Sequence, residues 1–296
     1  MESGQDSNEK DGNGSMNDSF GDRMKLFEGM ESERRFMPTL PVMARIDGRC
    51  FTSFTREMDR PFDQRMTDLM VSTTKFLVDE TGARMGYTQS DEISLCWLSN
   101  HIKSQIFFDG RIQKMVSQLA ALATAWFNDQ FNFHFDGYSY DTIPTFDARC
   151  WTVPNVEEGA NVFLWRELDA TRNSIESAAR AKFSHNQCFK KNCSELQDML
   201  FSLGVNWNDY PACFKRGTYV QRRKVIRKYT TEELDKLPEL HDARKNPDFE
   251  VERSELVVLD MPPFMKVTNR PGVIFYGQEP RLEKVVYEEN HQSVCS

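Results

Sequence analysis

The order of strands and helices predicted along residues 40–153 limits the possible folds of this chain more than any other feature of its sequence. Four short apolar runs, each bounded by polar or turn-forming residues, are typical of strands: 40–47, 83–88, 93–98 and 145–153. Two longer segments carry apolar residues every three or four positions, as helices that bury one face do: 63–80 and 111–131. The resulting β-α-β-β-α-β order predicts an α+β, ferredoxin-like fold, with one antiparallel sheet and two helices on one of its faces. We expect the other face to be free for a substrate.

Three regions are expected along the chain. Residues 1–19 are rich in Gly, Ser, Asn and Asp, which predicts a disordered acidic tail with order beginning near Phe20. Residues 20–155 form the unit described above, and residues 156–296 are expected to be mainly helical. The elements expected in this last region are a long helix at 161–183, short helices that begin at Ser194 and Thr230, a basic strand within 214–228 and a loop-rich tail from Leu256.

Composition narrows the class of protein. The net charge is −8, of which residues 1–19 contribute −4, so any binding of RNA must depend on local basic patches and metal ions. The seven cysteines are scattered and form no CxxC pair, which argues against a structural zinc site and favours free thiols. No apolar run reaches the roughly 18 residues of a membrane helix, and no secretory leader is visible. We therefore expect a cytoplasmic protein without a membrane partner.

Two carboxylates are predicted to meet at one end of the sheet. Asp47 ends the first strand just before Gly48, and Asp91 lies in the polar turn Ser90-Asp91-Glu92 of the predicted hairpin. The first and third strands are neighbours in a ferredoxin-like sheet, so both aspartates can reach one site. Magnesium prefers such oxygen ligands, and two ions about 4 Å apart suit phosphoryl transfer. The alternative is that these aspartates are ordinary turn residues.

Basic residues suggest where anionic substrates bind. Arg45 and Arg49 flank Asp47, while Arg111 and Lys114 open the second long helix, where free N–H groups favour a triphosphate. Residues 214–228 contain seven basic residues, no acidic one and two interleaved aromatic rings, a pattern typical of RNA-binding surfaces. Either group can instead be a solvated surface, and the basic run an edge strand guarded against aggregation. No HExxH, GxSxG, Walker A or GxGxxG pattern supports another chemistry.

Six segments in this order resemble motifs of the tRNA-His guanylyltransferase family, and the similarity covers roughly residues 20–225. They are Arg45-Ile-Asp-Gly-Arg49 with Phe51, Arg60-Pro-Phe-Asp63, Tyr87-Thr-Gln-Ser-Asp-Glu92, Phe146-Asp-Ala-Arg149, Trp165-Arg-Glu-Leu-Asp169 and Phe214-Lys-Arg-Gly-Thr218. The resemblance implies a polymerase-like palm domain with two Mg²⁺ ions, and a C-terminal part that contacts tRNA and supports a homotetramer. It also implies that the 3′-hydroxyl of a nucleoside triphosphate attacks a tRNA 5′-phosphate, activated as a triphosphate or by ATP.

The same resemblance assigns roles to individual residues. Asp47, the Gly48 carbonyl and Asp91 are expected to hold the metal ions, with Ser90 and Glu92 supporting catalysis. The residues expected to bind the nucleotide, ATP or GTP, are Arg45, Gly48, Arg49, Cys50, Phe51, Arg60, Asp63, Arg111 and Lys114. The residues expected to bind RNA are Arg172, Asn173, Lys215, Arg216, Arg222 and Arg223.

Three departures from the family pattern refine the expected function. Of the polar run that follows the Trp165 motif in eukaryotic tRNA-His enzymes, only Asn173 is retained, which is typical of bacterial-type relatives that repair truncated tRNA 5′ ends on a template. The family lysine tied to 5′ activation is Arg60 here, and the usual Arg-Lys-Gly order reads Lys215-Arg216-Gly217. The expected activity is thus template-dependent 3′-to-5′ nucleotide addition. Its rivals are G addition to tRNA-His, a nucleotide cyclase with the same palm, and a non-catalytic RNA-binding protein.

Overall fold

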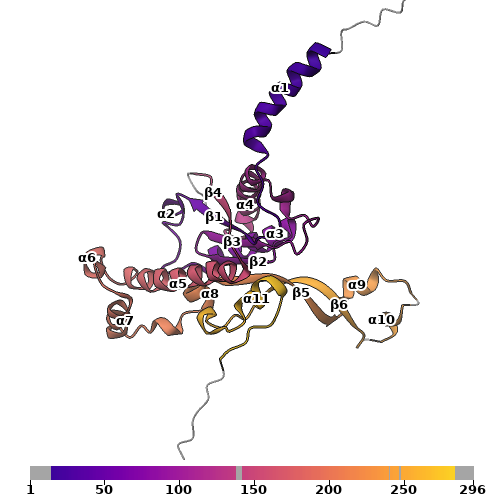
Figure 1. Cartoon of the computed structure of the whole chain (residues 1–296). Coiled ribbons are helices and arrows are strands. Elements are labelled where there is room, and N and C mark those ends of the chain that lie inside the picture. The colour runs from indigo at the N-terminus through magenta and orange to yellow at the C-terminus, as the bar shows by residue number, and fades with distance from the viewer. Residues whose placement is uncertain (1–14, 138–141, 240, 247, 284–296) are drawn as a thin grey trace, which may run out of the picture.

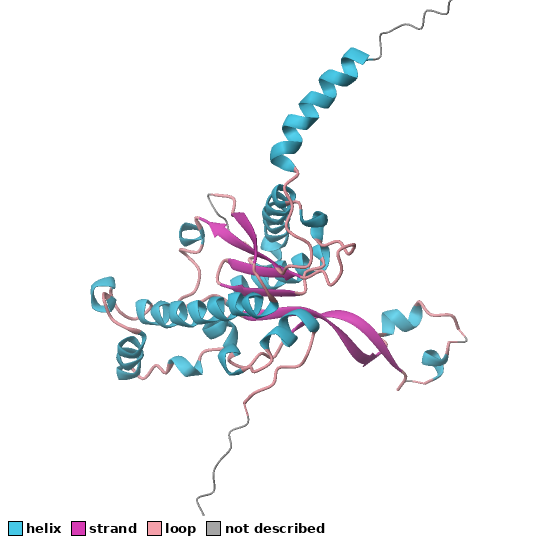
Figure 2. Cartoon of the chain, viewed as in Figure 1, coloured by secondary structure: helices cyan, strands magenta, loops and turns pink. Residues whose placement is uncertain are grey.

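One six-stranded sheet forms the centre of the molecule, with helices on both of its faces (Figures 1 and 2). The computed structural model describes residues 15–137, 142–239, 241–246 and 248–283. The strands are β1 (Val42–Arg49), β2 (Met85–Gln89), β3 (Glu92–Trp97), β4 (Thr145–Thr152), β5 (Thr218–Lys228) and β6 (Glu250–Val258). All neighbouring strands pair antiparallel, in the order β4-β1-β3-β2-β5-β6.

The helices surround this sheet in chain order. Those of the first half are α1 (Ser15–Ser32), α2 (Phe51–Phe54), α3 (Gln64–Thr81) and α4 (Ile112–His134), with the 3-10 turn η1 (Phe107–Gly110) before α4. Those of the second half are α5 (Val156–Arg180), α6 (His185–Cys188), α7 (Cys193–Ser202), α8 (Ala212–Arg216), α9 (Thr231–Asp235), α10 (Asp242–Lys245) and α11 (Arg270–Tyr276), with the 3-10 turns η2 (Trp207–Asp209) and η3 (Phe264–Lys266).

Helices α3 and α4 cover one face of the sheet, as the sequence predicted. Their buried residues, including Leu69, Leu77, Leu119 and Phe127, join strand residues such as Ile46 in the largest apolar cluster. Burial of this kind, at about 25 cal/mol per Å² of apolar surface, is the main force that fixes helices against a sheet. The helix α3 starts at Asp63, whose side chain caps the N–H of Arg65, and ends at Gly82 with φ 64°.

The opposite face is covered over much of its area, so the expectation that it is free was wrong for that part. Buried side chains of β2, β3 and β5 pack there against Phe163 of α5, Phe264 of η3 and the buried face of α11. The sequence pattern of the strands cannot show this, because α5, η3 and α11 lie far from β2 and β3 along the chain. The face is open at β4, where Asp147 and Arg149 are exposed.

The second half of the chain adds strands as well as helices. The predicted basic strand is β5, which pairs with β2 through Thr88↔Thr218, so both halves share one sheet. The long helix begins at Val156, capped by Asn155, rather than at 161. The cap expected at Ser194 is Asn192, which forms a capping box with Glu195. The helix predicted after Thr230 is α9. The strand β6 was not predicted and ends inside the tail from Leu256 that was expected to be loop-rich, and α11 lies within that tail.

The N-terminal helix α1 projects away from the rest of the molecule (Figure 1). It begins at Ser15, before the predicted start of order near Phe20, while residues 1–14 of the expected tail lie outside the described residues. Within the described part of the chain, no helix is both long enough and apolar enough to cross a membrane.

Candidate active site at the turn between β2 and β3

The turn between β2 and β3 brings two carboxylates to the end of β1. The Gly48 N–H donates to the Asp91 carbonyl oxygen over 3.1 Å, and Asp47 lies opposite Glu92 in the β1–β3 register. Ser90 adopts a left-handed conformation, φ 54°, which makes the two-residue turn tight. The predicted meeting of Asp47 and Asp91 is therefore what the fold produces.

Asp47 and Asp91 interact electrostatically and have no basic partner. Burial raises the pKa of the Asp91 carboxyl, and the negative charge of Asp47 raises it further, against a lowering hydrogen bond from Ser90. Within the described ranges, neither aspartate forms an ion pair. Two such carboxylates fit a divalent cation, which would relieve their repulsion. No group of three or more His, Cys, Asp or Glu side chains in the described part of the chain is placed to hold a metal ion, so a Mg²⁺ ion here would take the rest of its shell from waters and phosphate oxygens.

Glu92 has a different environment from its two neighbours. Its carboxylate accepts hydrogen bonds from Arg166 Nε at 2.6 Å and Nη2 at 2.8 Å, and Arg166 also binds Asp169 at 3.0 Å. Burial raises the pKa of Glu92, while the charge of Arg166 opposes that rise. A bidentate arginine–carboxylate pair is directional. Glu92 therefore anchors α5 to the sheet beside the aspartates.

The loop after Asp47 is tightly packed. A side chain at Gly48 would meet the Phe51 ring, since an added Cβ would lie 2.4 Å from it. Phe51 packs against Phe127 and Phe146, and Cys50 has φ 60°. This packing fixes the position of the Gly48 carbonyl, so residues 48–51, predicted to bind the nucleotide, shape the site. Arg49 is exposed.

A pocket adjoins the turn on the α3 side. It encloses about 710 Å³ of empty space, part of it open to solvent, and its lining includes Arg60, Asp63, Ser90 and Phe214. Arg60 donates to the Thr55 carbonyl at 3.0 Å. Burial would raise the pKa of Asp63, but hydrogen bonds from Arg65 and from the Asp59 and Arg65 N–H groups lower it. Asp63 thus caps α3 at the edge of this pocket, whose enclosed cavity is about 120 Å³.

Arg111 and Lys114 are not brought to the carboxylates. Because β3 leads away from the turn, the helix that follows it starts at the far end of the sheet, where Trp97 of β3 stacks on Phe107. The later part of α4 lies near the site, through Phe127 and its contact with Phe51. Within one chain Arg111 and Lys114 therefore start α4 away from the two aspartates, and their role in nucleotide binding stays a prediction.

The residues predicted to bind RNA differ in how far their charge is compensated. Arg172 pairs with Asp169, Arg222 with Asp79, and Arg223 with Glu279 at 2.8 Å. Lys215 donates to the Asn208 carbonyl and lies over the Trp207 ring at 5.6 Å. Arg216 forms no ion pair with the described residues, and Asn173 is exposed on α5.

Trp165 and Arg166 take positions in the site that sequence reasoning did not assign. Both belong to the Trp165–Asp169 segment that resembles a family motif. The three-residue spacing of Arg166 and Asp169 on a helix is a sequence signal for an ion pair between them. The partner of Arg166, Glu92, lies 74 residues earlier, which no local pattern shows.

Comparisons with known proteins identify the family. The model of the tRNAHis guanylyltransferase family matches residues 21–154. A solved bacterial tRNA(His) guanylyltransferase (Thg1)-like protein in complex with ATP is 35% identical, over 69% of this chain and 87% of its own, with a TM-score of 0.64. The chain belongs to the tRNA(His) guanylyltransferase family. Another such structure, in complex with GTP, is 31% identical over 84% of this chain and 94% of its own, with a TM-score of 0.64.

A curated enzyme of the tRNA(His) guanylyltransferase family is similar to this chain over most of its length. The tRNA(His) guanylyltransferase of Schizosaccharomyces pombe is 28% identical over 80% of this chain and 98% of its own length. Enzymes of this family are nucleotidyltransferases, so the predicted enzyme class is confirmed at that level.

Proposed function

We propose that this protein adds nucleotides in the 3′-to-5′ direction to the 5′ end of a tRNA, with Asp47 and Asp91 as the carboxylates of a two-magnesium site. The observation that carries the proposal is the aspartate pair at the turn, which is partly buried and has no ion-pair partner among the described residues. The strand order β4-β1-β3-β2, with α3 and α4 on one face, supports a polymerase-like palm. The ATP and GTP complexes of the two bacterial relatives support nucleotide substrates.

The residues of this chain have distinct tasks in the proposed reaction. Asp47, Asp91 and the Gly48 carbonyl bind magnesium, which when bound neutralises phosphate charge and lowers the barrier to phosphoryl transfer. Ser90 donates to Asp91, and Glu92 holds α5 in place through Arg166. The 3′-oxygen of the incoming nucleotide forms a bond to the 5′-phosphorus of the RNA, and the bond to the leaving pyrophosphate or AMP breaks.

We further propose that the physiological reaction is templated repair of truncated tRNA 5′ ends. The structural relatives at 31% and 35% identity are both bacterial Thg1-like proteins, and this chain retains only Asn173 of the eukaryotic polar run. The alternative is G addition to tRNA-His, the activity named for the fission yeast relative. A homotetramer in the cytoplasm is part of the same proposal.

A tRNA lacking its first nucleotide distinguishes these activities. It is supplied as 5′-monophosphate and as 5′-triphosphate, with Mg²⁺ and each nucleoside triphosphate in turn, and extension is followed on a gel. Addition of the base complementary to the opposite strand supports repair, whereas addition of G to every template supports the tRNA-His activity. Extension of the monophosphate with ATP shows that Arg60 supports 5′ activation.

Replacement of a metal-site carboxylate tests the site itself. We expect Asp91→Asn to lower nucleotide addition by at least about 10³-fold, because an amide is a poor Mg²⁺ ligand and positioning of charge supplies most of this catalysis. Asp198→Asn, at an exposed aspartate of α7 away from the β2–β3 turn, is the matched control and should retain activity within a few-fold. A folded Asp91→Asn variant with full activity contradicts the metal assignment.

A further inference from the structure

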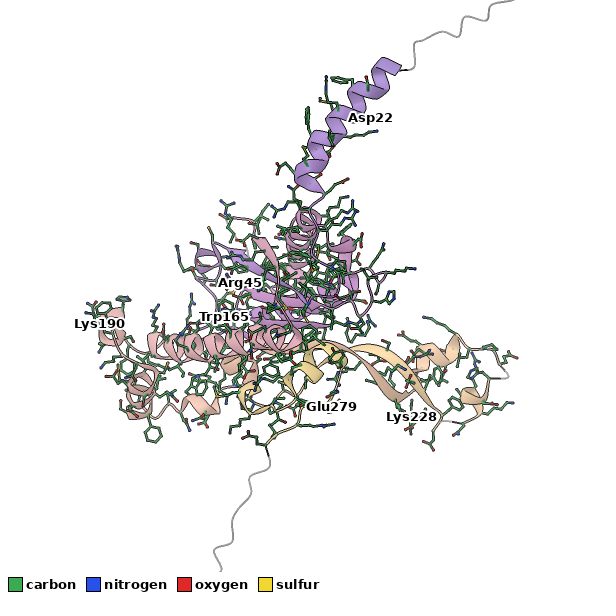
Figure 3. The ribbon with its side chains drawn as sticks, in the orientation of Figure 1. Asp22, Arg45, Trp165, Lys190, Lys228 and Glu279 are labelled. Carbon is green, nitrogen blue, oxygen red and sulfur yellow. The ribbon has the colours of Figure 1, made fainter. Side chains whose placement is uncertain are left out.

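A large aromatic side chain stands exposed beside the candidate active site. Trp165 of α5 is 50% exposed, and its ring lies 4.5 Å from the guanidinium of Arg166 and 5.9 Å from that of Arg45. Figure 3 shows Arg45 and Trp165 near one another, where α5 passes the strands of the sheet. The two arginines fix the position of the indole by cation–π contacts, and half of its surface is left for another partner.

Arg45 is held incompletely. Its Nε is buried and donates no hydrogen bond within the described residues, and its distance to Glu92 Oε2, 3.8 Å, is too long for one. Ser94, directly opposite Arg45 in the β1–β3 register, has a buried hydroxyl that also has no partner there. Buried polar atoms without partners are few in folded proteins, and two at one place indicate a site that a ligand or water completes.

The surface next to Trp165 is open at β4. Arg149 faces Arg45 in the β1–β4 register, and it is exposed where β4 forms the uncovered end of the sheet. Arg149 pairs with Asp147 at 3.0 Å, so its charge is largely compensated. Asp47 follows Arg45 by two residues on the same face of β1, a separation of about 7 Å. A nucleotide with its phosphates at Asp47 and Asp91 therefore has its base, one sugar away, within reach of the indole.

We propose that Trp165 is a positioning residue that stacks on a nucleobase of the substrate. The inference rests on the proposed function, since it assumes that a nucleotide phosphate lies at Asp47 and Asp91. The ligand is a planar base with a phosphate, and it has two possible sources: the free nucleoside triphosphate or the 5′-terminal nucleotide of the RNA. Stacking on an aromatic ring accepts every base, so Trp165 holds the nucleotide and leaves the choice of base to other contacts.

Equilibrium binding to the full chain in Mg²⁺ buffer tests this proposal without relying on turnover. Trp165→Leu keeps apolar bulk but removes the ring, while Trp165→Phe keeps a ring. Phe201→Leu, at an exposed ring of α7, is the matched control. Dissociation constants are measured by calorimetry for GTP and ATP, for 5′-phosphorylated RNA, and for tripolyphosphate, which has no base.

We expect Trp165→Leu to raise the dissociation constant of one base-containing ligand by about 5- to 150-fold, the range for loss of a stacked base. Trp165→Phe should keep most of the affinity, and tripolyphosphate should bind all variants equally. A rise for GTP and ATP assigns the free nucleotide as the stacked partner, and a rise for RNA assigns the terminal nucleotide.

Two results would overturn the stacking role. One is unchanged binding of all ligands by Trp165→Leu, and the other is an equal loss of tripolyphosphate binding, which would mean a distorted phosphate site. If the variants differ from the wild type in binding as expected, but the wild-type protein adds no nucleotide to RNA, the proposed function alone is contradicted. A wild-type chain that binds neither nucleotide nor RNA contradicts both.

Discussion

Carboxylates near the covered face of the sheet differ chiefly in the partners that hold them. Asp47 and Asp91 carry charge without an ion pair in the described part of the chain, whereas Glu92 is bound by Arg166. Glu167, the next residue of α5, is buried and accepts from the Tyr219 hydroxyl at 2.9 Å and the Phe264 N–H at 2.7 Å. Of these four carboxylates, only Asp47 and Asp91 have no ion pair or protein anchor between elements in the described residues, while the glutamates join α5 to the sheet and to η3.

The buried Glu167 predicts how stability depends on pH. Burial raises its pKa above the ordinary value of 4.5, although the bonds from Phe264 and Tyr219 oppose this. The folded state then binds the proton more tightly than the unfolded state, so this contribution to stability is full below about pH 4.5 and is lost as pH rises through the folded pKa. The difference in free energy of unfolding, wild type minus Glu167→Gln, should fall between pH 5 and pH 8 in urea titrations. A difference that is constant or that rises with pH would contradict the raised pKa.

At the scale of elements, the basic strand β5 is largely neutralised by its neighbours. Lys224 pairs with Glu252 on β6, and Arg227 binds both Glu233 and Glu255. Lys228 of the same strand, labelled in Figure 3, pairs with Asp248. Ion pairs at a surface add little to stability, but they lower the positive potential that RNA would meet. For residues 224–228 of β5, the charges therefore favour the alternative reading, in which the basic residues protect a strand from aggregation and do not bind RNA.

Salt dependence of RNA binding separates the two ends of this basic segment. Neutralising Lys215 and Arg216, which form no ion pair with the described residues, should lower the slope of log K against log salt by about two. Neutralising Arg222 and Arg223, which are ion-paired, should lower it by less than about one. Filter binding of tRNA across a salt series measures both. Equal slopes for the two double variants would show that the ion pairs do not shield β5.

The sequence predicted elements well where the pattern was local. The strands around Asp47 and Asp91, the stop at Gly82 and the helix after Thr230 follow from periodicity and caps within a few residues. The strand β6 was missed because its first half, Glu250-Val-Glu-Arg-Ser254, is largely charged and shows no apolar run, and it is a strand because it pairs with β5. The covered face and the Glu92–Arg166 pair depend on segments far apart in the chain. A single sequence does not show such contacts.

At the scale of the whole molecule, α1 adds little to the packed body. Phe20, Phe27 and Met30 are each more than half exposed, and one contact is the hydrogen bond from Gln113 to the Glu31 carbonyl, 3.0 Å. Removal of residues 1–30 should leave the free energy of unfolding within about 0.5 kcal/mol of the full chain, the usual range for surface changes. Chemical denaturation of the two chains measures this. A clear loss of stability would show that α1 packs against the body in solution.

The pairing of β2 with β5 has a consequence for synthesis on the ribosome. The edge of β2 stays unpaired until β5, roughly 130 residues later, has been made, which at about 5 to 20 residues per second takes about 7 to 26 s. During that interval the nascent chain exposes an unpaired strand edge and the apolar side chains that α5, η3 and α11 will later bury. A fragment that ends near residue 154 would keep that exposure permanently. We therefore expect the matched family region 21–154, made alone, to expose the apolar side chains that α5, η3 and α11 bury in the full chain.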